Sequence, residues 1–371
     1  MRVIIAAAGT AGHINPGISI ANKIMQEDKN SEIIFIGTTR GLENDLVSRA
    51  GYELKTIEAY GLSKKISIDN MKKIAKTLKG FNQAKEIIKE FKPDIVIGTG
   101  GYICGATISA AKKLGIPTML HESNAFPGRA IKMLAKKTDT IMVSFKDTFT
   151  RIKGCKNVIH TGTPIRIKKQ KYSENKKLKI INDIGLKSDK SIVLIFGGSQ
   201  GAEKINHAIV EIIRNKLNKN YQIVWATGQK QFDIIKENLE LLNININNID
   251  KIKILPYIYN MEEVMNVADV VVSRSGAITV MEISNLGKPS ILIPLPNVSN
   301  NHQFYNAKIL ADKNAAKIIV NDELKGNNLN KAIEEIVLDS EKSKQMAESA
   351  YKMAMLDVEN KIYKEIEKLL K

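Results

Sequence analysis

The chain has 371 residues, of which 43% are hydrophobic, and 56 basic residues against 39 acidic ones give a formal net charge of +17. This length suits two domains at roughly 150 residues each, and the composition excludes a disordered or low-complexity chain. No apolar run reaches the ~18 residues of a spanning helix, and the one after Met1 is too short for a signal peptide. The two cysteines, Cys104 and Cys155, lack metal-ligand spacing. We therefore expect a two-domain protein in a reduced, cytosolic compartment.

The basic excess has two explanations that the sequence leaves open. A polyanionic partner would favour it, and so would an AT-biased genome that encodes Lys, Asn and Ile freely, as in residues 243–248. Nucleic-acid binding is disfavoured, because the chain has few aromatic residues and no segment in which basic and aromatic residues interleave. The location of the charge therefore matters more than its total.

Strand-like apolar runs alternate with helical periodicity through most of the chain, which indicates parallel sheets built from strand-helix units. In the first half, strands are expected at residues 2–8, 32–37, 53–57, 94–98, 117–120 and 139–143. In the second half, they are expected at 191–197, 221–226, 252–255, 269–272 and 289–293. Residues 167–190 are lysine-rich with little apolar periodicity and are interpreted as a connector, whereas the pattern after residue 326 is purely helical.

This order predicts the fold class α/β, with two doubly wound Rossmann-like domains that face each other across a cleft. The first domain is expected at residues 1–164 and the second at 165–348. Residues 349–371 are expected to form a C-terminal helix that packs back on the first domain. Open α/β sheets bind ligands at the carboxyl ends of their strands, so we expect the functional residues in the loops that follow the strands.

Two glycine-rich turns, one in each half, follow strand-like runs and precede helix-like stretches. Residues 9–12 are Gly-Thr-Ala-Gly, and residues 197–201 are Gly-Gly-Ser-Gln-Gly. Glycine lets backbone N–H groups approach a ligand closely, and the N-terminus of the following helix favours phosphate. The first turn lacks the G-x-G-x-x-G order and no acidic residue ends the second strand, which argues against a dinucleotide. The turns predict one phosphate-bearing ligand in each half of the chain. The alternative is that each turn is only a tight connection between a strand and a helix.

His13 directly follows the first turn, at the carboxyl end of a predicted strand. An imidazole titrates near neutrality and can take a proton from a hydroxyl, so His13 is a candidate general base, although a histidine in a loop can also be structural. Two further polar loops, residues 98–102 and 121–128, follow strands of the same half. Together they predict a binding surface at one edge of the first sheet.

The second half carries a polar set of its own at strand ends. Arg274 follows a predicted strand, and Glu282 lies in the next helix, where a carboxylate can accept both hydrogens of a ribose diol. Gln303 and Asn306 are about one helical turn apart, so both amides can bond sugar hydroxyls. With the turn at residues 197–201, this set describes a site for a nucleoside diphosphate.

Metal-binding motifs are missing from the sequence. No acidic pair follows a strand, and neither an H-E-x-x-H motif nor a P-loop lysine occurs. A metal-bound nucleotide is therefore not indicated. Backbone donors, a helix terminus and Arg166 or Arg274 would have to stabilise a leaving diphosphate.

Residues 64–89 carry eight lysines against two acidic residues. Met71, Ile74, Ala75, Leu78 and Phe81 fall at helical spacing on one face. An amphipathic helix that covers its sheet would explain this pattern, and so would a helix end that rests on anionic lipid. The two explanations are compatible.

Taken together, residues 9–13, 121–125, 197–202, 274–282 and 302–306 resemble the MurG family of peptidoglycan N-acetylglucosaminyltransferases, which have the GT-B fold. The resemblance covers nearly the whole chain, with the motifs in the family's order and spacing. It implies transfer of GlcNAc from UDP-GlcNAc to the C4 hydroxyl of MurNAc in lipid I, which gives lipid II. It also implies an inverting enzyme without metal or other cofactor, peripheral to the cytosolic face of the membrane. The implied partners are UDP-GlcNAc, lipid I and an anionic membrane surface, with cell-wall synthesis proteins as further candidates.

The resemblance assigns roles to individual residues. His13 is the expected general base, and the acceptor-binding residues are Thr10, Gly12, Tyr102 and Asn124. The residues implied to bind UDP-GlcNAc are Arg166, Ser199, Gln200, Glu282, Gln303 and Asn306. Ala11 stands where the family's turn commonly has glycine, and its methyl group would obstruct a positive φ.

Two alternative functions stay open on the sequence. A related GT-B transferase that glycosylates diacylglycerol or another polyprenyl lipid would share the donor loops and differ in the acceptor half. A catalytically silent sugar-nucleotide sensor or membrane scaffold would keep the nucleotide-binding residues of the second half and lack the polar strand-end residues of the first half. His13 and Asn124 argue against the silent protein.

Overall fold

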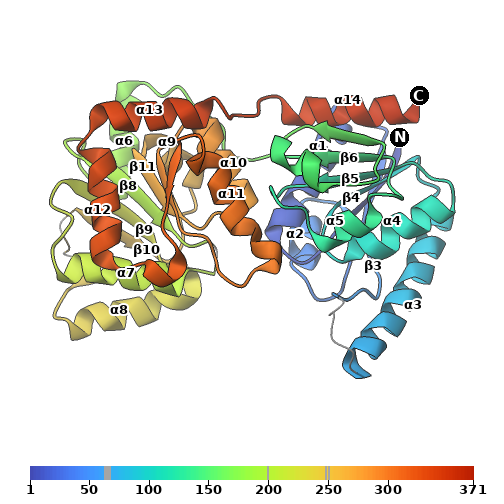
Figure 1. The fold of residues 1–371 in the computed structure, drawn as a ribbon, viewed down its shortest axis with the longest axis horizontal. Helices are drawn as coiled ribbons and strands as arrows, with labels where there is room; N and C mark the ends of the chain where they lie inside the picture. Colours follow the sequence, from blue (N-terminus) through green and yellow to red (C-terminus); the bar gives the residue numbers. More distant parts are fainter. Residues whose placement is uncertain (62–67, 199, 247–248, 250) are drawn as a thin grey trace. The chain divides into compact units, whose positions relative to one another are not determined.

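The fold was analysed in a computed structural model that describes residues 1–61, 68–198, 200–246, 249 and 251–371. The chain divides into two compact units, one formed by Met1–Ile165 with Met355–Lys371 and the other by Arg166–Ala354 (Figure 1). The predicted start of the C-terminal segment, residue 349, lies inside helix α13 (Ser340–Tyr351). Met346 of α13 packs into the core of the second unit, so the segment that joins the first unit begins at Met355 instead.

The first unit is built on a parallel sheet that has seven strands among the described residues, in the order β3-β2-β1-β4-β5-β6-β7. The strands are β1 (Arg2–Ala7), β2 (Glu32–Gly37), β3 (Glu53–Thr56), β4 (Ile95–Gly100), β5 (Thr118–Glu122), β6 (Thr140–Val143) and β7 (Asn157–His160). The strand order reverses between β1 and β4, which makes the carboxyl ends of these two strands the expected ligand-binding point. β7 was not predicted, because it is a half-exposed edge strand with only two apolar residues.

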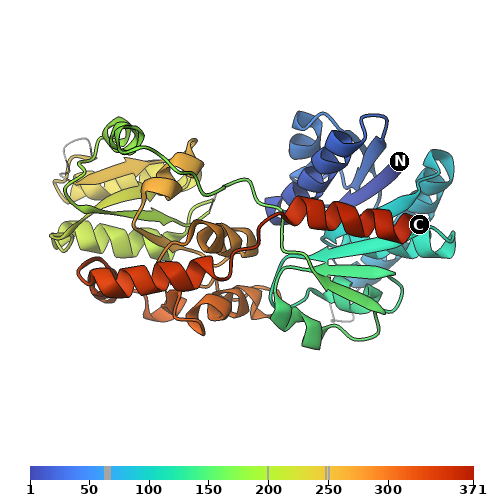
Figure 2. The same ribbon diagram turned by 90° about the horizontal axis from the view of Figure 1, so that it is seen from above.

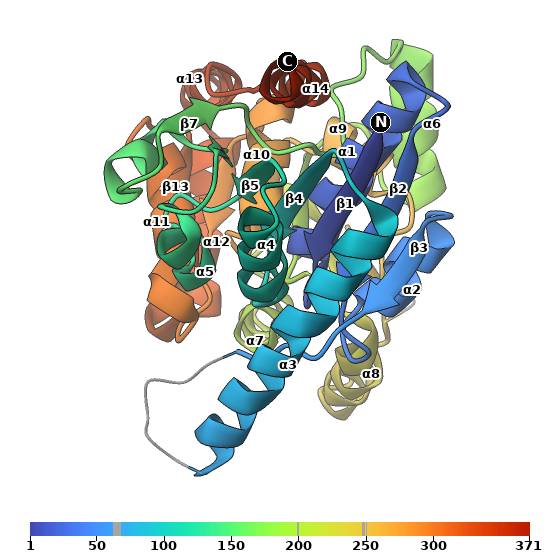
Figure 3. The ribbon, with the colours of Figure 1, turned by 90° about the vertical axis from the view of Figure 1, so that its right-hand side faces the viewer.

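Helices cover both faces of this sheet. They are α1 (Ala11–Glu27), α2 (Glu43–Arg49), α3 (Ile68–Phe91), α4 (Ile103–Lys113), α5 (Arg129–Leu134) and α14 (Val358–Leu370). Successive residues of a strand point to opposite faces. Ile4 of β1 accordingly joins a core with α3 and α4, and Ile5 joins a core with α1, α2 and α14. Figure 3 shows α3 beside α4.

The C-terminal helix α14 packs on α1 of the first unit, as the sequence predicted (Figure 2). Val358, Ile362 and Ile366 follow each other at four-residue spacing, so they share one face of the helix. All three are buried in the core that α1 also lines. None of the helices in the described part of the chain is long and apolar enough to cross a membrane.

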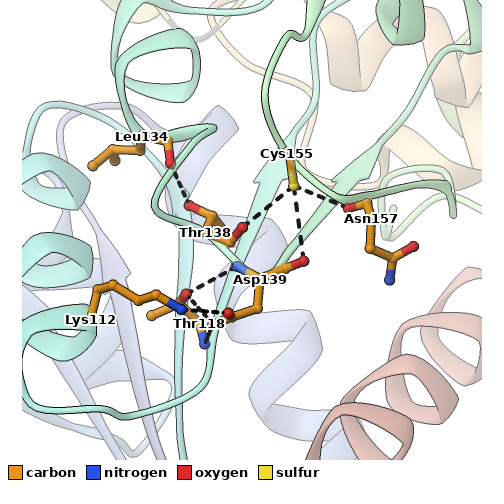
Figure 4. Close-up of polar contacts among 7 residues, drawn as sticks. All are labelled: Lys112, Thr118, Leu134, Thr138, Asp139, Cys155 and Asn157. Carbon is orange, nitrogen blue, oxygen red and sulfur yellow. Dashed lines mark hydrogen bonds and ion pairs between the residues drawn. The ribbon is translucent and has the colours of Figure 1, made fainter.

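A polar cluster fixes the amino edge of β5, β6 and β7, opposite the ligand-binding edge (Figure 4). Asp139 accepts hydrogen bonds from Thr118 N (2.9 Å) and Thr118 Oγ1 (2.8 Å). It also forms an ion pair with Lys112 Nζ (2.6 Å). The Cys155 thiol donates to the Thr138 carbonyl (3.5 Å). These bonds explain the positions of both Asp139 and Cys155 without a catalytic or metal-binding role.

The second unit repeats the arrangement with a parallel sheet that has six strands among the described residues, in the order β10-β9-β8-β11-β12-β13. The strands are β8 (Ser191–Phe196), β9 (Tyr221–Ala226), β10 (Ile252–Leu255), β11 (Val270–Ser273), β12 (Ser290–Leu292) and β13 (Ala316–Ile318). The order reverses between β8 and β11. β13 was missed by the sequence analysis because it is only three residues long and contains a lysine.

The helices of the second unit, in addition to α13, are α6 (Glu174–Ile184), α7 (Glu203–Arg214), α8 (Phe232–Leu241), α9 (Met261–Val267), α10 (Ala277–Leu286), α11 (His302–Ala311) and α12 (Gly326–Val337). The core beneath α7, α8 and α12 contains Trp225, which is fully buried. The connector predicted at residues 167–190 was wrong in part, because it contains α6. Ser173 caps the start of α6 and Gly185 (φ 85°) ends it, while its lysines leave only a narrow buried stripe of isoleucines.

Candidate active site

The first glycine-rich turn joins β1 to α1. Gly9 has a φ of +96°, and Thr10 caps α1, with the His13 and Ile14 N–H groups donating to the Thr10 carbonyl (3.0 and 3.2 Å). Ala11 is already the first residue of the helix, and its φ is not positive. The positive φ that a methyl group would obstruct is not required at Ala11, because Gly9 is the residue of this turn that has one.

His13 is held by backbone groups of β1 and β4. Its Nδ1 lies 3.2 Å from the Ala8 carbonyl oxygen, and its own carbonyl accepts a hydrogen bond from Thr99 Oγ1 (2.7 Å). A carbonyl can only accept, so Nδ1 carries the proton and Nε2 carries the lone pair of the neutral ring. A Cβ on Gly100 would collide with the His13 ring, so the imidazole packs directly on backbone. This is the tautomer that a general base acting through Nε2 needs.

A register shift brings Thr99 to this position. β1 and β4 pair as Ala6 with Gly98 and then Ala7 with Gly100, which leaves Thr99 as an extra residue in β4. Such bulges re-aim side chains and are common beside active sites. Gly100 (φ +129°) and Gly101 (φ +84°) then turn the chain into α4, with Tyr102 at its N-cap.

The loop after β5 is organised by Glu122. This buried carboxylate accepts hydrogen bonds from Asn124 N (2.8 Å), Asn124 Nδ2 (3.0 Å) and Gly128 N (2.7 Å). Burial raises the pKa of Glu122 above its ordinary value. Its neighbour His121 is also buried, which lowers its pKa to about 4, and its Nε2 donates to the Gly162 carbonyl (2.9 Å). Glu122 therefore orients Asn124 and has little access to a substrate proton.

β1, β4 and β5 are adjacent, so the loops that follow them lie at one edge of the sheet. The structure thus brings the five predicted residues of the first unit to that edge: Thr10, Gly12, His13, Tyr102 and Asn124. The sequence analysis missed Glu43, whose buried carboxylate accepts a hydrogen bond from Gly9 N (2.9 Å). An acidic residue in the first turn of a short helix is ordinary, and no signal in the sequence marks this one.

The second glycine-rich turn joins β8 to α7. Gly201 (φ +79°) packs so closely on the Thr227 carbonyl that a Cβ there would collide, whereas the Cβ position of Gly198 (φ +91°) faces open space. Gly201 N donates to Gly198 O (2.9 Å) and closes the turn. Gln200 is exposed, and Ser199 lies outside the described residues.

A pocket of about 380 Å³ lies beside this turn. Its lining includes three residues from different parts of the second unit: Arg166, Gly198 and Glu282. Glu282 is half-buried, and desolvation raises its pKa to about 7 although the nearby Arg166 acts in the opposite direction. The two predicted ligands of a nucleotide therefore meet in one pocket. A carboxyl that titrates near neutrality can switch between donating and accepting hydrogen bonds there.

The pocket has an aromatic wall that the sequence analysis missed. Tyr257 and Tyr259, in the loop after β10, contact each other edge to face with 5.0 Å between ring centroids. Tyr259 is 86% exposed and Tyr257 is 41% exposed, so both rings are accessible from the pocket side. Two tyrosines separated by a single residue, in a loop after a parallel strand, are a signal that could have been read in the sequence.

Of the remaining predicted residues, Arg274 lies in the loop after β11, and Gln303 and Asn306 lie in α11. Arg274 donates to the Ile293 carbonyl (3.1 Å), so it holds the β12 loop. Gln303 Oε1 accepts from Leu295 N (2.9 Å), and Asn306 Nδ2 donates to Ser275 O (3.1 Å). Arg274, Gln303 and Asn306 therefore each use a polar group to fix these loops. Among the residues that the structure describes, no group of three or more His, Cys, Asp or Glu side chains is arranged to hold a metal ion.

Comparison with known proteins connects this geometry to a family. Residues 3–143 match the N-terminal domain of glycosyltransferase family 28, and residues 192–362 match its C-terminal domain. The UDP-N-acetylglucosamine--N-acetylmuramyl-(pentapeptide) pyrophosphoryl-undecaprenol N-acetylglucosamine transferase of Thermoanaerobacter sp. (strain X514) is 42% identical over 369 residues, covering 100% of both chains. A transferase of the same description from Bacillus cereus is 40% identical over 371 residues, again covering 100% of both.

Solved structures agree. The crystal structure of Acinetobacter baumannii MurG matches with a TM-score of 0.78 and 26% identity, covering 99% of both chains. The calicheamicin glycosyltransferase CalG4 matches with a TM-score of 0.68 at 13% identity, which supports the two-domain fold alone. The chain is 42% identical over its full length to a named transferase, matches both family 28 domains and resembles the MurG structure. These findings establish that it belongs to the MurG family of glycosyltransferases, within glycosyltransferase family 28.

Proposed function

We propose that the protein transfers GlcNAc from UDP-GlcNAc to the C4 hydroxyl of MurNAc in undecaprenyl-pyrophosphoryl-MurNAc-pentapeptide, lipid I, and so forms lipid II. The observation that carries the proposal is the combination of His13 in the first unit with the pocket of Arg166 and Glu282 in the second. It occurs in a chain that is 42% identical, end to end, to transferases named for this reaction.

The reaction is a single displacement. His13 Nε2 accepts the proton of the acceptor hydroxyl, and the hydroxyl oxygen bonds to the anomeric carbon of GlcNAc. The bond between that carbon and the UDP oxygen breaks, and its electron pair leaves with UDP. Attack from the face opposite the leaving group inverts the anomeric centre. Thr10, Gly12, Tyr102 and Asn124 hold the acceptor at this edge of the first sheet.

The second unit binds the donor. The ionised Glu282 carboxylate accepts both hydrogens of the ribose diol, and the tyrosine wall contacts the base. Arg166 and the donors of the turn around Gly198, Ser199 and Gln200 stabilise the diphosphate. Gln303 and Asn306, in the first half of α11, are the proposed contacts of the donor sugar.

No metal or other cofactor takes part in this proposal. The charge that develops on the leaving UDP is met by Arg166 and backbone N–H groups, which is the role that a divalent cation plays elsewhere. Activity that persists in EDTA would support this point, and activity that requires added Mg²⁺ or Mn²⁺ would overturn it.

The protein acts as a peripheral protein on the cytosolic face of the membrane. Ile74 and Leu78 of α3 are 42% and 64% exposed, with Lys72, Lys76 and Lys79 exposed around them. Beyond Gly80, by contrast, Ala84 and Ile88 are buried against the sheet, so the later part of α3 covers the core. Lys64 and Lys65 of the same segment lie outside the described residues. The exposed apolar pair suits insertion among lipid headgroups, with the lysines on anionic lipid.

Vesicle co-sedimentation tests the membrane contact. The double substitution Ile74→Glu and Leu78→Glu is expected to abolish binding to anionic vesicles. Leu338→Glu is a matched control, because Leu338 is also 64% exposed but lies at the end of α12 in the second unit. Equal binding of the α3 variant and the control would contradict the assignment.

Glycosylation of diacylglycerol or another polyprenyl lipid is the alternative that the relatives do not favour, since their descriptions name a pyrophosphoryl-undecaprenol acceptor. Offering lipid I and diacylglycerol to the enzyme with UDP-GlcNAc separates the two. The proposal expects a disaccharide lipid from lipid I, and glycosylation of diacylglycerol alone would contradict it.

A further inference from the structure

Glu43 is a fully buried carboxylate in the first turn of α2, outside every role described so far. Its Oε2 accepts a hydrogen bond from Gly9 N (2.9 Å). Its Oε1 accepts bonds from Thr38 N (2.9 Å) and Thr38 Oγ1 (2.7 Å). Buried carboxylates are costly unless paired or fully hydrogen-bonded, so this one needs an explanation.

The backbone around Glu43 is shaped to receive it. A Cβ on Gly37 would lie 2.7 Å from Glu43 Cγ, and a Cβ on Gly41 would collide with the carboxylate itself. Both glycines therefore leave room that a side chain would fill. The carboxylate is also ionised: burial opposes its charge, but the hydrogen bonds from Gly9 and Thr38 hold the pKa of Glu43 below its ordinary value.

One peptide group connects Glu43 to His13. The N–H of the Ala8–Gly9 peptide donates to Glu43 Oε2 (2.9 Å), and the carbonyl of the same peptide accepts from His13 Nδ1 (3.2 Å). Gly101 allows this arrangement, because a Cβ there would lie 2.6 Å from the Ala8 oxygen. Hydrogen bonds in series polarise each other, so a negative charge at the N–H end increases the electron density on the carbonyl oxygen.

We propose that Glu43 is a positioning residue that raises the basicity of His13 through the Ala8–Gly9 peptide. The charge and the hydrogen bond fix the peptide plane, and the polarised carbonyl holds the Nδ1 proton. As Nε2 takes a proton from the acceptor, the positive charge that forms on the ring is stabilised by this carbonyl. The arrangement serves the same purpose as a carboxylate bonded directly to a catalytic histidine, with a peptide group inserted between the two.

Other titratable side chains on the neighbouring elements are neutral or have partners of their own, as Glu122 on β5 has in Asn124 and Gly128. β1 and β4 carry no titratable side chain near their carboxyl ends. His121 on β5 also acts on His13, but its pKa of about 4 keeps it neutral at physiological pH. Asp45 on α2 is exposed and pairs with Arg49 (2.7 Å). Arg40, in the loop before α2, lies over the ring of Tyr60 (3.9 Å to the centroid).

The test compares Glu43→Gln with Asp45→Asn, which removes an exposed carboxylate from the same helix. NMR titration reports the pKa of the His13 ring, and His13→Gln identifies its signal among the five histidines. We expect Glu43→Gln to lower the His13 pKa by about one unit, as the loss of a nearby charge does. We expect no shift in Asp45→Asn. An unchanged His13 pKa in Glu43→Gln would overturn the proposal.

Kinetics separate this role from a purely structural one. The proposal rests on His13 as the base of the proposed transfer, so Glu43→Gln should lower kcat about tenfold and move the acid limb of the pH profile down with the His13 pKa. In a His13→Ala background it should have no further effect on kcat. A raised acceptor KM with an unshifted profile would mean that Glu43 only shapes the turn. The NMR titration needs no turnover. It therefore measures the effect of Glu43 on the His13 pKa even if the transferase assignment fails.

Glu43→Asp covers the case in which Glu43→Gln does not fold, as judged by circular dichroism. The shorter carboxylate keeps the buried charge but withdraws it from Gly9 N. We expect a smaller fall in the His13 pKa than in Glu43→Gln. A His13 pKa equal to that of the wild type in a folded Glu43→Asp would also overturn the proposal.

Discussion

The two glycine-rich turns occupy equivalent places in the two sheets, at the strand-order reversals, yet they are built differently. In the first unit, the Gly9 N–H points inward to the buried Glu43 carboxylate. In the second unit, the turn is tightened by Gly201 against the Thr227 backbone, while Gly198 stays open beside a pocket. The same sequence feature therefore holds His13, the proposed base, in one unit and borders the proposed donor pocket in the other.

This difference separates chemistry from donor binding. Changes in the first unit should reduce turnover and spare the affinity for UDP-GlcNAc. Changes in the second unit should do the reverse.

Replacing the base has the largest expected effect. His13→Ala should lower kcat by about 10²–10⁴-fold, the usual contribution of general acid–base catalysis. Its affinity for UDP-GlcNAc, measured by isothermal titration calorimetry, should match that of the wild type. His207→Ala is the control, because His207 is an exposed histidine on α7 of the second unit for which no role is proposed. Near-normal turnover of His13→Ala would contradict the base assignment.

Removing Glu282, the proposed ligand of the ribose, should lower the affinity of the second unit for UDP-GlcNAc. Glu282→Ala should weaken UDP-GlcNAc binding about 10–100-fold, since it leaves two sugar hydroxyls without their acceptor at roughly 1.5–3 kcal/mol. Glu237→Gln, an exposed carboxylate on α8, should have no effect. If Glu282→Ala binds the donor normally, Glu282 has no contact with the ribose.

The pH dependence of donor binding sharpens the same point. The pKa of Glu282 is about 7, raised from an ordinary 4.5 by burial, so the carboxyl is mainly protonated at pH 6 and mainly ionised at pH 8. A diol donates both hydrogens only to the ionised form, so UDP-GlcNAc should bind about tenfold more tightly at pH 8 than at pH 6. Glu282→Gln should bind with an affinity that does not change over this range. A pH-independent wild type would contradict the prediction.

The aromatic wall has the smallest expected effect. Tyr259→Ser should weaken UDP binding about two- to fivefold, through the loss of one exposed aromatic contact with the base. Fluorescence titration with UDP can measure this change. Tyr351→Ser, which removes a half-exposed tyrosine from α13, should leave the affinity unaltered. Equal affinities of the two variants would place the base elsewhere.

Much of the fold was predictable because the central strands are continuous apolar runs. β1 and β8 are buried on both faces and were read directly from the sequence. β7 and β13 were missed because edge strands bury one side only, and α6 was missed because its lysines obscure three buried isoleucines. The C-terminal boundary was misplaced because two consecutive helices belong to different units.

The candidate site was predictable where a residue follows a strand directly. Arg274 could be found in this way, His13 by its place just after the glycine-rich turn that follows β1, and Glu282 by its position in the helix after β11. Glu43 could not, because its meaning depends on a contact with a turn 34 residues earlier in the chain. Arg274 shows another limit: its type suggested a phosphate ligand, and the sequence did not indicate that its Nη1 donates to the Ile293 and Pro294 carbonyls.

The most direct test of the account is incubation of the purified protein with UDP-GlcNAc and a lipid I analogue in EDTA, with the lipid product identified by mass spectrometry. The account predicts a GlcNAc-MurNAc disaccharide lipid from the wild type, and at least a hundredfold less from His13→Ala at saturating donor. No disaccharide from the wild type, or equal amounts from both proteins, would contradict it.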